Sequence, residues 1–326
     1  MIITFISCGT SKRTSFTNEL VKNTYGGEIS PNDLKTNIYK LASDDFEGRR
    51  TGENGQKIAA KYIAEQYKKL GIKPPLGFEN YFQKIPQEFL KKHSNSSSEN
   101  VVAYIRGNEK PDELLIISAH YDHLGIKGKN IYNGADDNAS GTSAVLAIAK
   151  AFQKAKIEGD GPKRSILFLH FTGEEEGLFG SKYYTVHPIF PLSNTVCNLN
   201  IDMVGRVDNE HKNKPEYVYL IGADKLSSEL HKISEDVNNN YTKLKLDYIY
   251  NDDNDPNRFY YRSDHYNFAK NNIPIIFYFN GVHKDYHKPT DTADKINYTI
   301  LTKRTQLIFY TAWEIANREQ RLAVDN

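Results

Sequence analysis

Short apolar runs alternate with amphipathic stretches along most of the chain. The runs at 113–120 and 164–171 are apolar at nearly every position, a pattern typical of strands that are covered on both faces. The stretch at 55–71 differs, because its apolar residues recur at the spacing of one helix face and Gly71 is suited to end that helix. The chain therefore carries strand signals and helix signals in alternation.

These patterns extend over the whole chain. We expect strands at 100–107, 113–120, 164–171, 195–203, 217–222 and 273–281, and helices from about residue 32 and at 55–71, 139–155, 227–240 and 298–317. Strands that alternate with helices predict an α/β fold, in which a mostly parallel twisted sheet has helices on both faces. No internal boundary stands out, so we expect a polar leader or tether over 1–31 and a single domain over 32–326.

Composition argues against two classes of partner. The chain has 326 residues, with 42 Lys and Arg against 41 Asp and Glu, and no basic stripe with interleaved aromatic residues. This balance argues against nucleic acid and against an anionic membrane surface. No stretch reaches the ~18 apolar residues that a transmembrane helix needs.

The two cysteines predict no disulfide framework. Cys197 lies in an apolar strand pattern, where we expect a small buried thiol. Cys8 ends the run "MIITFISC", in which small Ser7 precedes a cysteine suited to acylation, as at the end of a bacterial lipoprotein signal. The apolar part is short and a basic n-region is missing, so an ordinary chain terminus is the alternative. We favour the lipoprotein interpretation, which predicts an extracytoplasmic protein of the periplasm or cell envelope, anchored by a lipid at Cys8.

Polar residues gather where the predicted strands end. The carboxyl ends of parallel strands meet at one edge of a sheet, and ligands and catalytic groups collect there. Residues from distant parts of the chain are thus expected at a single edge. They are His120, Asp122, Asp136, Asp137, Glu174, Glu175, Glu176, Asp202 and His287.

These residue types predict a metal site. Three adjacent acids at 174–176 repel one another, and a cation would neutralise them. Histidine with Asp or Glu, and without cysteine, suits Zn²⁺ or a related divalent ion in a catalytic site. One ion needs about three protein ligands, whereas five candidates that include a bridging Asp fit two ions a few ångströms apart.

Six motifs in order resemble the M28 family of metallo-aminopeptidases, whose members carry a pair of metal ions. The motifs are "SAHYDHLG", "GADDNASG", "FTGEEEGLFGS", "NIDMVGR", "SDHYNF" and "YHKPTDT". The resemblance covers most of the chain and implies the zinc-exopeptidase (phosphorylase/hydrolase-like) fold. Members often carry an inserted protease-associated domain. Here only the short "QEFLKKHSNSSSEN" precedes a strand, so we expect that insertion to be absent.

The resemblance also assigns the metal ligands. It implies that His120 and Asp202 complete one metal site, that Glu175 and His287 complete the other, and that Asp137 bridges the two ions, which are expected to be zinc.

Catalytic roles follow from the same motifs. Glu174 matches the general base of the family, which acts on a metal-activated water, and Asp122 matches the carboxylate that orients His120. Tyr286 is similar to a tyrosine that polarises the scissile carbonyl in some members. Glu176 has no role in the family, so we expect a solvated or locally paired acid.

Some candidates have simpler interpretations. Asp136 is expected to lie in a turn and cap the following helix, and His123 and His283 are expected to be structural or rim residues. The run Ser263–His265 is not a serine-protease triad, because adjacent residues cannot align nucleophile, base and orienting acid. We expect these residues to support the pocket wall, with a helix that starts at Ser263.

The favoured function is aminopeptidase action on peptides with a free N-terminus. Carboxypeptidases and glutaminyl cyclases share the implied fold, and the cyclases work with one zinc ion. A non-catalytic, receptor-like relative is a further alternative. Such relatives lose ligands or the base, whereas every matching position is occupied here.

Overall fold

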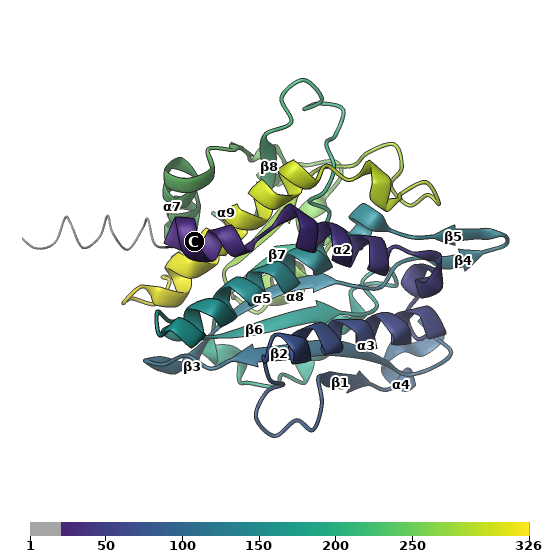
Figure 1. Ribbon diagram of the computed structural model, residues 1–326, viewed down its shortest axis with the longest axis horizontal. Coiled ribbons are helices and arrows are strands. Elements are labelled where there is room, and N and C mark those ends of the chain that lie inside the picture. Colours follow the sequence, from purple (N-terminus) through teal and green to yellow (C-terminus); the bar gives the residue numbers. More distant parts are fainter. Residues whose placement is uncertain (1–20, 326) are drawn as a thin grey trace, which may run out of the picture.

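A mixed eight-stranded sheet lies at the centre of the computed structural model, which describes residues 21–325 (Figure 1). The strand order is β1-β2-β6-β3-β7-β10-β8-β9. The four central strands, β6, β3, β7 and β10, are parallel to one another. The strand bounds are β1 Phe82–Ile85, β2 Ser98–Ile105, β3 Lys110–His120, β6 Arg164–Phe171, β7 Thr195–Ile201, β8 Tyr217–Ile221, β9 Lys245–Asp247 and β10 Ile275–Phe279.

Antiparallel pairing is confined to the flanks of the sheet, where β2 pairs with β6, β1 with β2, and β8 with β10. The predicted α/β sheet is therefore confirmed, with parallel strands at its centre and one further parallel pair, β8 with β9, at an edge. The outermost strands β1 and β9 were not predicted, because each is too short to show an apolar period.

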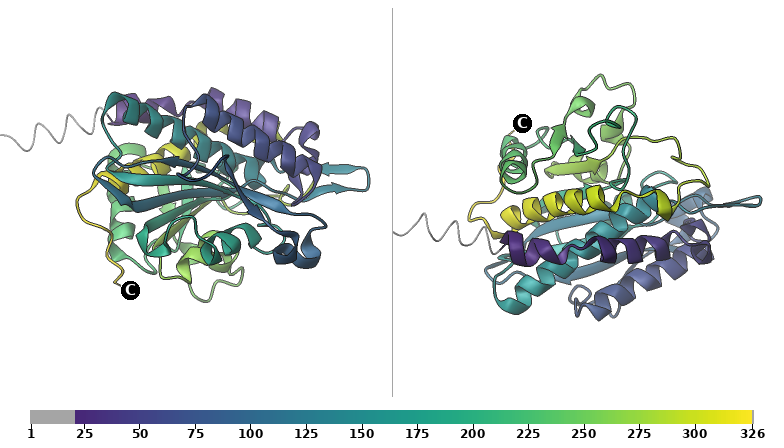
Figure 2. Two further views of the ribbon diagram at one scale, coloured as in Figure 1. Left: turned by 90° about the horizontal axis from the view of Figure 1, so that it is seen from below. Right: turned by 45° about the horizontal axis from the view of Figure 1, so that its top comes forward.

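Helices cover both faces of the sheet (Figure 2). Helices α3, α5 and α9 contact one face, and α8 contacts the other, with α6 packed against α8. The helix bounds are α2 Pro31–Leu41, α3 Asn54–Lys69, α4 Gln87–Leu90, α5 Gly141–Glu158, α6 Phe179–Val186, α7 Ser228–Val237, α8 His265–Ala269 and α9 Tyr298–Asn317. Helix α8 begins two residues later than predicted, a shift within the usual uncertainty of helix ends.

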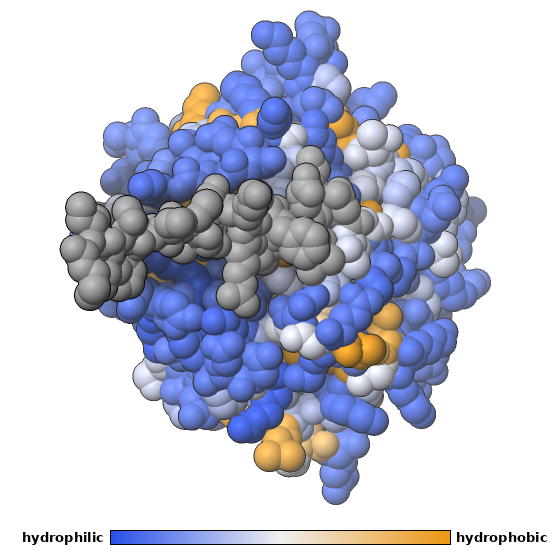
Figure 3. Space-filling view, turned by 60° about the vertical axis from the view of Figure 1, so that its left-hand side comes forward, coloured by the Kyte–Doolittle hydropathy of each residue, from blue (hydrophilic) through white to orange (hydrophobic). Residues whose placement is uncertain are grey.

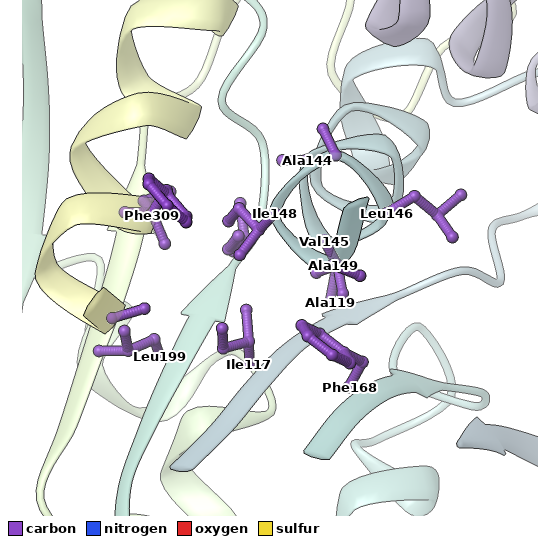
Figure 4. Close-up of a cluster of buried hydrophobic side chains, with 14 of the residues drawn as sticks. Ile117, Ala119, Ala144, Val145, Leu146, Ile148, Ala149, Phe168, Leu199 and Phe309 are labelled. Atoms are coloured by element: carbon purple, nitrogen blue, oxygen red, sulfur yellow. The ribbon is translucent and has the colours of Figure 1, made fainter. Parts of the chain in front are cut away.

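Alternation along the strands divides the core in two. On β3, Ile117 and Ala119 face α5, whereas Leu114 and Ile116 belong to the cluster on the opposite face. Ala144, Val145, Ile148 and Ala149 of α5 lie over Ile117, Ala119 and Phe168 of the sheet, with Phe309 of α9 beside them (Figure 4). The small residues of α5 let its backbone lie close to the strands that carry the polar edge.

The chain enters the core earlier than predicted. Val21, Tyr25 and Ile29 are buried, and the Tyr25 ring stacks on Trp313 with 5.3 Å between centroids. The predicted tether over 1–31 is therefore wrong for residues 21–31, which pack against the domain. Cys8 lies outside the described residues, so the lipid anchor stays a prediction.

Surface hydropathy and helix composition both bear on whether the described residues could contact a membrane. The face seen in Figure 3 is mostly hydrophilic, with small scattered hydrophobic patches among the coloured atoms. Within residues 21–325, no helix combines the length and the apolar character needed to cross a bilayer.

The carboxyl ends of the central strands meet near a projecting hairpin. The hairpin consists of β4 Gly125–Lys127 and β5 Asn130–Tyr132, and it joins the end of β3 to the loop that leads into α5 (Figure 1). This end of the sheet carries the polar residues predicted from the sequence.

Candidate metal centre

The structure brings the predicted metal ligands together from five segments. His120 is the last residue of β3, and Asp202 directly follows β7. Glu175 lies in the loop after β6, Asp137 precedes α5, and His287 lies in the loop after β10.

One donor set surrounds His120, whose side chain is 1% exposed. Its Nε2 lies 3.2 Å from Oδ1 of Asp202 and 3.3 Å from Oδ1 of Asp137. A second set surrounds His287, whose Nε2 lies 3.1 Å from Oδ2 of Asp137 and 3.1 Å from Oε2 of Glu175. The two carboxylate oxygens of Asp137 therefore face different histidines, as a bridging ligand requires.

The donor sets fit divalent ions. Ligands of one tetrahedral zinc ion, with bonds of about 2.0–2.2 Å, lie roughly 3.3 Å from one another. The N···O separations in both sets are 3.1–3.3 Å. Buried carboxylates facing one another are unfavourable unless a cation compensates them, and imidazole with carboxylate is a donor set that zinc accepts.

Distance alone also places Glu174 and His123 at the centre. Donor atoms of His120, Glu174 and Asp202 lie within 4.8 Å of one another, and so do those of His123, Asp137 and Glu175. Oε2 of Glu174 is 4.0 Å from Nε2 of His120, farther than the two ligand oxygens. That larger separation leaves Glu174 free of the closest donor set.

His123 was expected to be a structural or rim residue, and the structure places it in the interior, beside the donor residues. Its side chain is buried, and its Nδ1 lies 2.6 Å from Oε1 of Glu175 and 3.7 Å from Oδ2 of Asp137. Gly134 makes room for the ring, since a Cβ at that position would lie 2.6 Å from Cδ2 of His123. The spacing of His123 from His120 in "HYDH" was the only signal in the sequence.

The three adjacent acids have three different environments. Burial raises the pKa of Glu174 well above its usual value, His120 opposes this, and Asp202 and Glu175 add to it. Burial and Asp137 also raise the pKa of Glu175, but His123 and His287 outweigh them, so that pKa is lowered. Glu176 lies 3.4 Å from Nε of Arg50 and 3.4 Å from Nδ1 of His93, so it is locally paired, as expected.

Asp122 holds the loop behind His120. Its carboxylate accepts hydrogen bonds from the Thr51 hydroxyl at 2.8 Å and from the Glu174 backbone N–H at 3.2 Å. Nδ1 of His120 lies 3.1 Å from the Asp122 backbone carbonyl and 3.6 Å from its carboxylate. The direct contact that orients the ring is thus to the main chain of Asp122.

Asp136 does not cap the helix that follows, contrary to expectation. Its Oδ1 accepts a hydrogen bond from the Gly205 N–H at 2.7 Å, and its Oδ2 lies 3.1 Å from Nε2 of His283. Asp136 and His283 therefore tie the loop before α5 to the loops after β7 and β10. His283 is a buried structural residue.

The "RSDH" run supports the centre from outside the metal ligands. The Ser263 hydroxyl donates to Oδ2 of Asp202 at 2.7 Å, which the sequence did not reveal. Asp264 is buried, and burial raises its pKa to about 7. His265 faces the Tyr260 carbonyl at 2.8 Å and makes no triad with its neighbours.

A small pocket of about 30 Å³ opens beside the centre. Its walls combine Glu174 and His287 with apolar side chains, and Tyr286 and Arg262 stand at it as well. The Tyr286 hydroxyl accepts a hydrogen bond from Nη2 of Arg262 at 3.4 Å. The apolar side chains are Met203, Phe259, Phe277, Phe279 and Val282. A larger groove of about 770 Å³, between α2, α3 and α5, is lined by none of the donor residues.

Comparison with known sequences agrees with this geometry. Residues 100–312 match the sequence profile of Peptidase family M28. Aminopeptidase YwaD of Bacillus subtilis is 33% identical over 138 residues, which are 42% of this chain and 28% of that protein. A probable zinc metalloprotease of Pyricularia oryzae is 26% identical over 258 residues, 67% of this chain and 50% of that protein. In these and a third relative the match covers 28–55% of the relative's length.

Solved structures share the fold. LapB from Legionella pneumophila superposes with a TM-score of 0.73 at 20% identity, covering 95% of this chain and 82% of that one. A glutaminyl cyclase from Porphyromonas gingivalis superposes with a TM-score of 0.65 at 18% identity, covering 87% of this chain and 97% of that one. At these identities the likeness establishes the zinc-exopeptidase fold and no more.

Proposed function

The chain belongs to peptidase family M28, and on this basis we propose that it is a metal-dependent aminopeptidase that removes N-terminal residues from peptides. The observation that carries the proposal is Asp137, whose two oxygens face His120 and His287 at 3.3 and 3.1 Å. A shared carboxylate between two donor sets is the arrangement that holds a pair of ions.

Two divalent ions would occupy the centre. His120, Asp202 and Asp137 would hold one, and Glu175, His287 and Asp137 the other. Relatives that are named zinc metalloproteases support zinc as the ion. When bound, zinc would supply Lewis acidity, which polarises a carbonyl oxygen and makes water more acidic.

Glu174 would act as the general base. Its carboxylate reaches the centre without belonging to the closest donor set, and burial raises its pKa. A buried carboxyl group beside the donor sets is suited both to accept a proton from the attacking water and to deliver it to the leaving amine. Asp122 and Thr51 would hold this loop in place.

The other pocket residues would bind the substrate. The Tyr286 hydroxyl accepts from Arg262, which leaves its own proton free to bond to the scissile carbonyl. The free amino group would lie among the acidic side chains of the centre. Phe277 and Phe279 are buried and pack at 5.2 Å between centroids, so they offer an apolar wall to the first side chain.

A pair of matched peptides tests the proposal. An alanine- or leucine-initiated peptide should lose its first residue, whereas the same peptide with an acetylated amine should stay intact. Treatment with a chelator should abolish the reaction, and added zinc should restore it. Equal turnover of the acetylated peptide, or release of residues from the C-terminus, contradicts aminopeptidase action.

Glutaminyl cyclase activity is the second candidate, because a cyclase shares the fold. The two outcomes differ in products from one peptide that begins with Gln. An aminopeptidase releases free glutamine, whereas a cyclase leaves the chain whole, forms a pyroglutamyl end and releases ammonia. Both donor sets are complete here, which favours the aminopeptidase.

A further inference from the structure

Arg49 is a buried cation behind the metal centre, and its guanidinium donates hydrogen bonds to backbone carbonyl groups. It is 0% exposed. Its Nη1 donates to the carbonyls of Leu41 at 2.6 Å and Asn133 at 2.7 Å, its Nε to Tyr121 at 2.8 Å, and its Nη2 to Gly134 at 3.0 Å. One planar guanidinium therefore holds the backbone of three separate segments.

Two of these segments carry metal ligands. Tyr121 lies between His120 and Asp122, and Gly134 lies three residues before Asp137. The backbone carbonyl of Arg49 also accepts a hydrogen bond from the His123 N–H at 3.2 Å. The fork geometry of arginine fixes two such segments relative to each other, which the single ammonium group of lysine cannot do.

The turn that presents Arg49 is strained. Glu47, Gly48 and Arg49 have φ values of 51°, 65° and 52°. This is a run of left-handed backbone conformations, which residues other than glycine rarely adopt. Gly48 is required, because a Cβ there would lie 2.5 Å from the Tyr132 carbonyl and 2.6 Å from the Gly125 carbonyl, at the base of the β4–β5 hairpin. Strain of this kind persists where surrounding contacts over-determine it, often at functional sites.

We propose that Arg49 is a positioning residue that sets the distance between the His120–His123 segment and the Asn133–Asp137 segment, so that both donor sets are preformed before metal binds. This inference rests on the proposed metal centre. Arg49 contacts no metal ligand side chain and no substrate, so its effect passes through the two backbones it holds.

Arg164 provides a matched control. It is the first residue of β6, at the end of that strand away from the metal centre. It is also 0% exposed and donates to three carbonyls, those of Ile315 at 3.0 Å, Arg318 at 2.5 Å and Glu319 at 3.2 Å. Its guanidinium also pairs with Glu113 at 2.6 Å. Lysine at either position keeps the charge and loses the fork, but only position 49 adjoins metal ligands.

The test measures metal binding, without any substrate, by protein from which a chelator has first removed all metal. Arg49→Lys and Arg164→Lys should both lower the thermal midpoint of the metal-free protein. Titration with Co²⁺, followed by its visible absorption, should show the dissociation constant raised ~10–100-fold in Arg49→Lys, the range for residues that orient ligands, and unchanged in Arg164→Lys. A dissociation constant equal to that of the wild type in Arg49→Lys, despite a lowered midpoint, overturns the proposal.

If Arg49→Lys does not fold, hydrogen exchange of the wild-type protein tests whether the two segments are ordered before metal binds. In chelated protein, amides of residues 119–123 and 133–138 should be protected to nearly the same degree as those of central β3. Fast exchange in both segments, slowed only when Co²⁺ is added, shows that the metal and not Arg49 orders them. Neither result depends on peptidase activity, so failure of the proposed function is recorded separately by the peptide assay.

Discussion

At the scale of single residues, neighbours that look alike in the sequence have different surroundings in the structure. Glu174, Glu175 and Glu176 are adjacent, yet they face a pocket, a histidine pair and a surface arginine respectively. Motif matching predicted a different role for each of the three acids, and those roles stay predictions. Arg49 and His123 escaped prediction, since what they do depends on contacts 72 and 52 residues away, to Tyr121 and Glu175.

Three amide substitutions should separate these roles. Glu174→Gln keeps shape but removes the proton acceptor, so kcat should fall by ~10²–10⁴ with metal content intact. Glu175→Gln should lose metal, because a neutral amide is a poorer ligand than a carboxylate.

Glu176→Gln is the matched control and should change neither kcat nor metal content. Metal analysis, kcat and the thermal midpoint are measured on all three variants. If Glu176 proves indispensable and Glu174 dispensable, the general base is misassigned.

At the scale of elements, long periodic segments were predicted well and short ones were missed. Helix α9 spans Tyr298–Asn317, as expected, and β6 spans Arg164–Phe171. The short strands β1, β9 and the β4–β5 hairpin depend on tertiary pairing and not on their own apolar period. The ends of the central strands were predictable, and with them the location of the site, because a parallel sheet gathers its carboxyl ends.

Strand β6 carries a pH-sensitive residue on its buried face. His170 is fully buried, and burial lowers its pKa to about 3 from an ordinary value of 6.5. Its Nε2 lies 2.6 Å from the Tyr67 hydroxyl of α3. Below pH 6.5 the unfolded chain binds a proton at this histidine that the folded chain does not bind until about pH 3. Stability is therefore present above pH 6.5 and is lost, by about 1.4 kcal/mol per pH unit, as the pH falls through that window.

Replacing His170 with Gln should remove this acid sensitivity. Urea unfolding of chelated protein at pH 7 and pH 5 should show that the variant loses about 2 kcal/mol less stability than the wild type over this interval. Parallel stability curves for wild type and His170→Gln would contradict the assignment.

At the scale of the whole molecule, the chain enters the described structure at the end opposite the metal centre. The first described segment, drawn in purple, lies on the left in Figure 1, and the β4–β5 hairpin beside the centre projects on the right. A lipid anchor at Cys8 would therefore be connected to the domain through this first described segment. Where the N-terminal segment joins the domain, relative to the metal centre, depends on the topology of the sheet. The sequence indicated that topology only through the order of its strands.

We predict that the protein carries a lipid at Cys8 in its native host, as "FISC" indicates. Mass spectrometry of protein from the membrane fraction should find an acylated cysteine at the mature N-terminus. Cys8→Ser should move the protein out of that fraction, whereas replacing the buried Cys197 by Ala should not. An unmodified Cys8 in protein that retains Met1 would refute the anchor.

The shared position of Asp137 also has a consequence for biosynthesis. Its Oδ1 faces His120, early in the chain, whereas its Oδ2 faces His287, which follows β10. During translation the N-terminal strands emerge first. Once Asp137 has been made, the first donor set lacks only Asp202. The second set also needs His287, which is made only when almost the entire chain is complete. A nascent or prematurely terminated polypeptide would thus contain most of the proposed ligands and the proposed general base, but it would lack the histidine that faces Oδ2 of Asp137. If the proposed function is correct, hydrolytic activity would therefore arise only at the end of synthesis, when the loop that carries His287 reaches the other donor residues.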